Sequence, residues 1–137
     1  FPYTTLFRSY DHDWHVREHG DQKNLKTGYT FNTKLFKNPK DMIEEFHKRG
    51  IRVGLVVNPT NGIYPMEQYY KQAMDYLKTA PNSIIQFDPL NPKYLDVLFK
   101  MFLHPLESMG VDFFFHISVV STFFSFSGIN RTFFYSF

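Results

Sequence analysis

The residues best suited to chemistry lie near the start of the chain, in the run Asp11-His12-Asp13-Trp14-His15. A carboxylate can accept two hydrogen bonds from neighbouring hydroxyl groups, and an indole offers a flat apolar surface on which a ligand can stack. Asp is also a common turn residue, and a Trp at a strand end can be an ordinary packed aromatic. Spacing alone favours a turn for Asp11, with recognition of a hydroxyl-rich ligand as the alternative, and it leaves Trp14 open between a stacking surface and a packed aromatic.

A metal site is the second chemistry that this run could support. His12, His15 and His19 stand beside Asp11 and Asp13, and imidazole and carboxylate ligands suit zinc and other transition metals. No second ligand pair with a recognisable spacing accompanies them. We therefore expect solvated or hydrogen-bonded histidines, no metal and no cofactor.

Alternating helices and strands are predicted to position these residues. Asn38-Pro39-Lys40-Asp41 is typical of a helix start, and Gly50 of its end. Ile51 to Val57 is a continuous apolar run, as expected of a parallel strand buried on both faces. The sequence predicts the following further elements: a helix over Pro65 to Leu77, a short strand over Ser83 to Phe87, a helix from Asn91-Pro92-Lys93 to Gly110 that Pro105 should kink or shorten, and a strand over Val111 to Phe115.

This alternation predicts an α/β fold with right-handed crossovers and a parallel sheet. Functional residues of such sheets gather beyond the carboxyl ends of the strands, so one rim should hold Asp11, Asp13, Asn58 and Asp88. Asn58 could shape a pocket there, although Asn-Pro also starts ordinary turns. An open doubly wound sheet fits as well, but its glycine-rich phosphate motifs are absent. We therefore predict a partial (β/α)8 barrel, about half of one, because a whole barrel needs roughly 250 residues and this chain has 137.

The amino-acid composition limits the classes of partner that we expect. The net charge is +2 and the basic residues are scattered, which does not favour nucleic acid or an anionic membrane. The chain contains no cysteine, which excludes thiolate chemistry and is compatible with a reducing compartment such as the cytoplasm. The apolar stretch from Phe113 to Ile129 is interrupted by polar residues, so we expect no membrane span.

Both ends differ in character from the middle. Residues 1–9 lack the features of a signal peptide and resemble a translated adapter. Residues 117–137 form a Ser-, Thr- and Phe-rich run without sustained periodicity, as expected of a frameshifted translation. We therefore expect a domain over residues 10–116, preceded by a foreign segment and followed by an aberrant tail.

Several short motifs together resemble those of glycoside hydrolase family 31, the α-glucosidase-like clan of retaining enzymes. They follow one another in the family's order over about residues 10 to 115: Asp11-His12-Asp13-Trp14-His15, Gly28-Tyr29-Thr30-Phe31-Asn32, Gly50-Ile51-Arg52-Val53, Asn58-Pro59, His104-Pro105-Leu106 and Gly110-Val111-Asp112-Phe113-Phe114. The resemblance implies a (β/α)8 catalytic domain that hydrolyses O-glycosyl bonds of α-glycosides.

The resemblance also implies individual roles. Asp11 would hydrogen-bond a hydroxyl of the sugar at the cleavage subsite, with Asp13 in a scaffold role. The family's nucleophile is an Asp at the end of the strand that follows Asp112, and Ile117 stands at that position here. Asp112 is no substitute, since it lies near the start of that strand. The acid/base would lie further on than Phe137, so we expect an active parent glycosidase but an inactive chain. The alternatives are a noncatalytic carbohydrate-binding or degenerate homologue and, with less support, an α/β domain that binds another small molecule.

Overall fold

The structure is a computed structural model that describes residues 6–8, 14–16, 28–116 and 134–136. Within them the chain forms a parallel sheet of four strands, in the order β1 (Leu6–Arg8), β2 (Arg52–Val57), β3 (Phe113–His116) and β4 (Phe134–Ser136). Strands that follow one another in the sequence are thus neighbours in the sheet. A doubly wound sheet reverses its strand order, whereas a barrel sheet does not. The observed order agrees with the barrel prediction.

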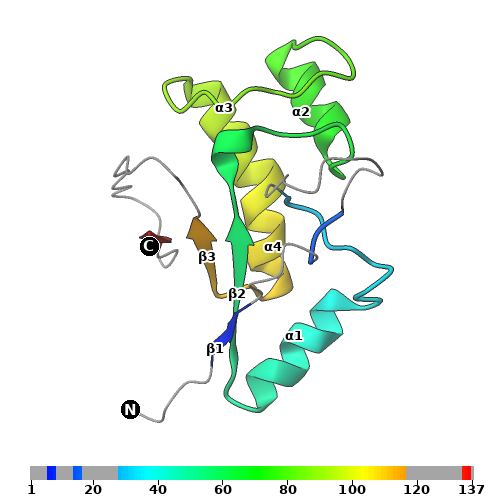
Figure 1. Ribbon diagram of the computed structural model, residues 1–137, viewed down its shortest axis with the longest axis vertical. Coiled ribbons are helices and arrows are strands. Elements are labelled where there is room, and N and C mark those ends of the chain that lie inside the picture. The colour runs from blue at the N-terminus through cyan, green and yellow to red at the C-terminus, as the bar shows by residue number, and fades with distance from the viewer. Residues whose placement is uncertain (1–5, 9–13, 17–27, 117–133, 137) are drawn as a thin grey trace.

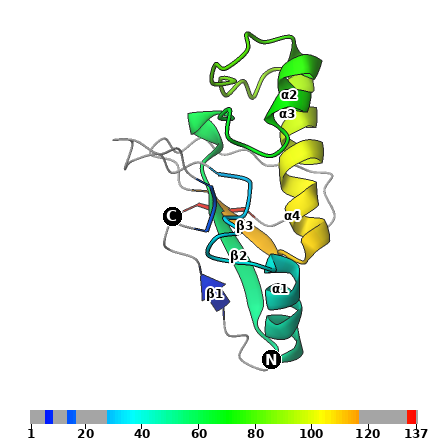
Figure 2. The same cartoon turned by 90° about the vertical axis from the view of Figure 1, so that its right-hand side faces the viewer.

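The two faces of β2 are both buried, as the apolar run predicted. Val53, Leu55 and Val57 join the main core together with Phe114 of β3, on the face that the helices cover (Figures 1 and 2). Gly54 and Val56 lie on the other face. The register pairs Gly54 with Phe113 and Val56 with Phe115, so the two Phe side chains share that face.

The helices that cover the sheet begin and end largely where the sequence predicted. Helix α1 (Pro39–Lys48) packs Ile43 into the core, and Gly50 follows it with a φ of 72°. Asn38 precedes the helix but makes no side-chain cap. The next long helix comprises α3 (Pro92–Val97), a π-helical segment η2 (Leu98–Leu103) and α4 (His104–Met109). Tyr94, Leu98, Phe102 and Leu106 lie buried on the face that packs into the core, and Leu95 and Phe99 are partly buried against it.

The π-helical segment explains how this helix passes Pro105. Proline has no N–H group and its ring displaces the preceding turn, which ordinarily breaks or kinks a helix. Here the amide of His104 donates to the carbonyl of Phe99, five residues earlier. The wider turn accommodates the proline without ending the helix, which continues to Gly110 with its φ of 114°.

Two predicted elements differ from the structure. The helix predicted over Pro65 to Leu77 begins only at Tyr70, as α2 (Tyr70–Leu77), after a series of turns and the short 3-10 helix η1 (Pro59–Asn61). The predicted strand over Ser83 to Phe87 is wrong. Ile85 instead makes an isolated antiparallel bridge with Ile63, with both hydrogen bonds at 2.9 Å. Asp88 therefore does not follow a strand of the sheet, and the basis for placing it on the rim is lost.

Each of the two unusual end segments contains a strand. β1 lies within residues 1–9 and pairs with β2, and β4 lies within residues 117–137 and pairs with β3. Pairing in the sheet does not reveal where a segment comes from, so the adapter and frameshift interpretations stay predictions. Among the described parts of the chain, no helix is long and apolar enough to cross a membrane.

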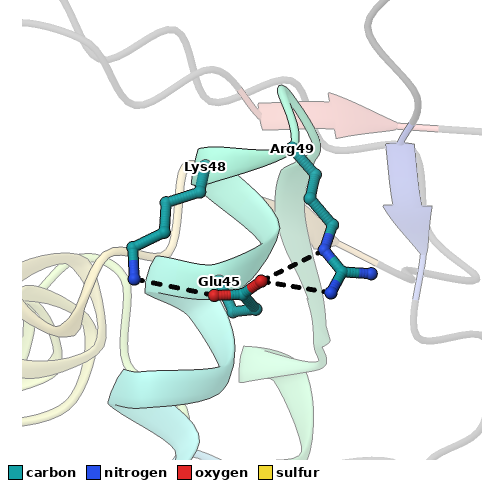
Figure 3. Close-up of polar contacts among 3 residues, drawn as sticks. All are labelled: Glu45, Lys48 and Arg49. Carbon is teal, nitrogen blue, oxygen red and sulfur yellow. Dashed lines mark hydrogen bonds and ion pairs between the residues drawn. The ribbon is translucent and has the colours of Figure 1, made fainter.

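The outer surface of α1 carries a small charged cluster, drawn in Figure 3. Glu45 lies between Lys48 and Arg49, with carboxylate–nitrogen distances of 3.6 Å and 3.1 Å respectively. The hydrogen bond from Arg49, followed by the charge of Lys48, lowers the pKa of Glu45. All three side chains are exposed, and ion pairs of this kind contribute little to stability. The cluster is a solvated helix face.

Gly54 provides the first testable prediction. A Cβ atom there would overlap the Phe113 ring and approach Phe115 within 2.8 Å, while Phe113 and Phe115 themselves stack edge to face at 4.9 Å. Gly54→Ala should therefore lower the free energy of unfolding by about 1–3 kcal/mol, the usual cost of overpacking. Urea unfolding followed by circular dichroism measures this.

The matched control is the double variant Gly54→Ala/Phe113→Leu, in which a smaller side chain makes room for the new methyl group. It should recover part of the loss, since the two positions share one contact. A Gly54→Ala variant as stable as the wild type would contradict this account of the packing.

Candidate functional site

Trp14 anchors the described part of the motif to the carboxyl end of β2. Its indole Nε1 donates a 2.9 Å hydrogen bond to the backbone oxygen of Val56. The ring packs edge to face against Phe31, with 5.0 Å between centroids, and only 2% of Trp14 is exposed. The structure favours the packing alternative for Trp14, because a ring so deeply buried offers no face on which a ligand could stack.

His15 packs beside Trp14 in a space that Gly28 leaves open. A Cβ atom on Gly28 would overlap the His15 ring, so a larger residue could not occupy that position without displacing the imidazole. The backbone of His15 pairs with Phe31 in an antiparallel bridge. Val16 N donates to Thr30 O at 2.9 Å, and Asn32 N donates to Trp14 O at 2.7 Å. Residues 14–16 and 28–32, separated in the sequence, thus form one small two-stranded unit.

Asn58 lies directly after β2, as predicted, and is partly buried. Its side-chain oxygen accepts a hydrogen bond from the Thr60 hydroxyl at 2.5 Å, and its backbone oxygen accepts from Asn61 N at 3.2 Å. These contacts are those of a turn that starts η1. The residue is therefore at the expected edge of the sheet, with its amide oxygen engaged locally.

Glu67 is the residue that the sequence analysis missed. It lies in the turns before α2 and is only 4% exposed. Its carboxyl group contacts residues 28–32, the segment that pairs with residues 14–16. Tyr29 N donates to its two carboxylate oxygens at 3.2 and 3.1 Å, and the Thr30 hydroxyl donates at 2.6 Å. Thr30 Oγ1 in turn accepts from Gln68 N at 2.9 Å. One signal was available: in a helix starting at Pro65, Glu67 would share a face with Tyr70, three residues on.

Burial changes the acidity of Glu67. Desolvation raises its pKa to about 7, against the opposing effects of the hydrogen bonds from Thr30 and Tyr29. A carboxyl group with a pKa near neutrality could transfer protons if a substrate could reach it. Here its oxygens are directed at an amide and a hydroxyl of the protein and are screened from solvent. The arrangement supports a structural tie.

Asp112 joins the amino-terminal ends of two strands, far from the rim. Its Oδ2 accepts hydrogen bonds from Val53 N and from His47 Nε2, both at 2.8 Å, and its own amide donates to Val53 O at 2.9 Å. The carboxylate therefore connects β2 and the residue before β3 to α1. This geometry confirms that Asp112 is placed for a structural role.

The remaining residues that the sequence analysis singled out lie outside the described part of the chain. They are Asp11, Asp13, His12, His19 and Ile117. β1 ends at Arg8, shortly before Asp11 in the sequence. In the residues that the structure does describe, no group of three His, Asp or Glu side chains could hold a metal ion.

Comparison with known proteins identifies one family. Residues 1–120 match the model described as the TIM-barrel domain of glycosyl hydrolases family 31. The match includes the motifs that carry the resemblance. No curated protein matches the chain.

The raised pKa of Glu67 predicts how stability depends on pH. Below about pH 4.5 the group is protonated in both states. Between 4.5 and 7 the unfolded chain ionises while the folded chain stays protonated, so the free energy of unfolding should fall as pH rises, by up to about 3 kcal/mol. Glu67→Gln should remove this component. Urea unfolding of both proteins at pH 5 and pH 8 gives the two slopes, and equal slopes would contradict the assignment.

Asp112 provides a second stability prediction. Asp112→Ala should lower the free energy of unfolding by about 1–3 kcal/mol, because Val53 N loses its side-chain acceptor. Thermal or urea unfolding measures the loss. Asp96→Ala is the control, since Asp96 makes only an exposed i,i+4 ion pair with Lys100 and its removal should matter little. Equal effects of both substitutions would contradict the role of Asp112.

Proposed function

Because the chain belongs to glycoside hydrolase family 31, we propose that it supplies part of the sugar-binding rim of a retaining α-glycosidase barrel. Asp11 accepts hydrogen bonds from a sugar hydroxyl at the cleavage subsite. Asp13 and Trp14 support that segment, and Asn58 shapes the neighbouring edge. The parallel strands and their sequential order support part of an eight-stranded barrel, and 137 residues suffice for about half of one.

The observation that supports this proposal best is the hydrogen bond from Trp14 Nε1 to Val56 O. It holds the residue that directly follows Asp13 next to the carboxyl end of β2. In barrel enzymes the active site lies at the carboxyl ends of the strands. Because Asp13 directly precedes Trp14 in the sequence, the location of Trp14 supports a role of this acidic segment in substrate binding.

We further propose that the chain binds an α-glycoside without cleaving it. Retaining glycosidases need two carboxyl groups about 5–5.5 Å apart, one of them a nucleophile. By the family resemblance, the position of that nucleophile corresponds to Ile117, and an aliphatic side chain can neither attack the anomeric carbon nor stabilise its positive charge. Two origins of this Ile are open: an aberrant translation of an active parent glycosidase, or a genuine noncatalytic homologue. Sequencing the transcript across Asp112 to Phe137 separates the two, since an Asp codon at 117 identifies a cleaving parent enzyme and a confirmed Ile codon favours a binding homologue.

The sugar-binding proposal predicts a specific loss with Asp11→Asn. Charged hydrogen bonds contribute about 1.5–3 kcal/mol, so binding of methyl α-D-glucoside should weaken by about 10- to 150-fold. Calorimetric titration or ligand-observed NMR measures the affinity. Asp41→Asn, the same change on the exposed face of α1, should bind like the wild type. Hydrolysis of p-nitrophenyl α-D-glucoside should stay at the level of buffer. Equal binding by Asp11→Asn and the wild type would contradict the role of Asp11.

A further inference from the structure

We propose that Glu67 is a positioning residue for the sugar subsite, an inference that rests on the proposed function. Its carboxyl group fixes Tyr29 and Thr30, and these residues fix the segment 14–16 that directly follows Asp11-His12-Asp13. The effect on the ligand is thus transmitted through the backbone. Glu67 itself touches neither the sugar nor the reacting atoms.

The first link is the tie between the turns before α2 and residues 28–32. Tyr29 N donates to both oxygens of Glu67, Thr30 Oγ1 donates at 2.6 Å, and Gln68 N donates back to Thr30 Oγ1 at 2.9 Å. Tyr29 is itself buried. Removing the carboxyl group would take both of these hydrogen bonds from the buried Tyr29 amide, which is unfavourable in a place screened from water. Residues 28–32 should therefore shift when Glu67 is replaced by a residue without an acceptor.

The second link is the two-stranded unit itself. Thr30 O accepts from Val16 N at 2.9 Å. Thr30 is therefore hydrogen-bonded to Glu67 through its side chain and to the segment 14–16 through its backbone. Asn32 N to Trp14 O, at 2.7 Å, provides the second hydrogen bond. The close packing of His15 on Gly28 adds a steric contact that tolerates little displacement. A shift of residues 29–30 must therefore shift residues 14–16 or break these bonds.

The third link is Trp14, which holds the segment from the opposite side. Its indole is bonded to β2 through Val56 O, while its backbone is bonded to Asn32. The segment is thus held between β2 and a tract that Glu67 fixes to the α2 side of the molecule. Two independent anchors define a position where one alone permits rotation.

Trp14 is also the means of testing this inference, because it is the single tryptophan of the chain. At 2% exposure its emission should lie at short wavelength and resist quenching by acrylamide. In Glu67→Ala the emission should shift to longer wavelength and the quenching constant should rise about twofold or more, with far-UV circular dichroism retained. Glu67→Gln, which keeps an acceptor oxygen, should restore both signals. Thr30→Val removes the hydroxyl's hydrogen bonds to Glu67 and Gln68 but keeps those from Tyr29 N to Glu67, so it should give a smaller shift. Glu45→Ala, which removes an exposed carboxylate, is the control.

The same variants are titrated with methyl α-D-glucoside. Glu67→Ala should bind at least about fivefold more weakly, roughly 1 kcal/mol, and Glu67→Gln should bind within about twofold of the wild type. A folded Glu67→Ala variant with unchanged fluorescence or unchanged affinity would overturn the inference. Should Glu67→Ala lose its circular dichroism, Thr30→Val decides, and an unchanged emission maximum there would overturn it as well. Failure of the wild type to bind the sugar would contradict the proposed function, which the fluorescence measured without sugar does not depend on.

Discussion

The register between β2 and β3 is the constraint on which the rest of the structure depends. Gly54 and Phe113 face each other across the two strands, and only a residue without a side chain leaves room for that ring. At the amino-terminal end, Asp112 accepts the amide of Val53 and so fixes the same register by a hydrogen bond. A slip by one residue would exchange the two faces of the strand and separate both contacts. Because α1, β1 and Trp14 all attach to β2, their positions follow from this pairing.

The sequence predicted the elements whose signals are local. The starts at Pro39 and Pro92 and the stops at Gly50 and Gly110 depend on backbone geometry that these residue types prefer. The start of α2 could not be predicted in this way. Gln68 N donates to the Thr30 hydroxyl, a partner 38 residues away, and the turns between Pro65 and Tyr69 are therefore satisfied without a helix. The predicted strand around Ile85 failed for a related reason, since apolar residues alone do not distinguish a sheet strand from a single bridge.

The same distinction between local signals and contacts of distant segments applies to the residues of the candidate site. The position of Asn58 at the end of β2 follows from the strand, and the sequence located it. The burial of Trp14 and the contact between His15 and Gly28 depend on which distant segments meet, and spacing could not reveal them. Several of the residues that carry the family resemblance thus have packing as their observed role. For this chain the family motifs indicate the fold more directly than they indicate the chemistry.

Glu67 illustrates why a buried carboxyl group can connect two segments better than a single hydroxyl group. Both its described donors, an amide and a hydroxyl, are uncharged, so the ionised form lacks the compensation that a nearby cation would give. The raised pKa is the consequence of that burial. The carboxyl group nevertheless has two oxygens, which accept from Tyr29 and Thr30 together. The shorter side chain of a serine or threonine at this position could not reach both donors. The tie therefore favours a single geometry for residues 28–32 over maximal stability. Segment 14–16 requires such a geometry, because it is held by backbone hydrogen bonds to that tract.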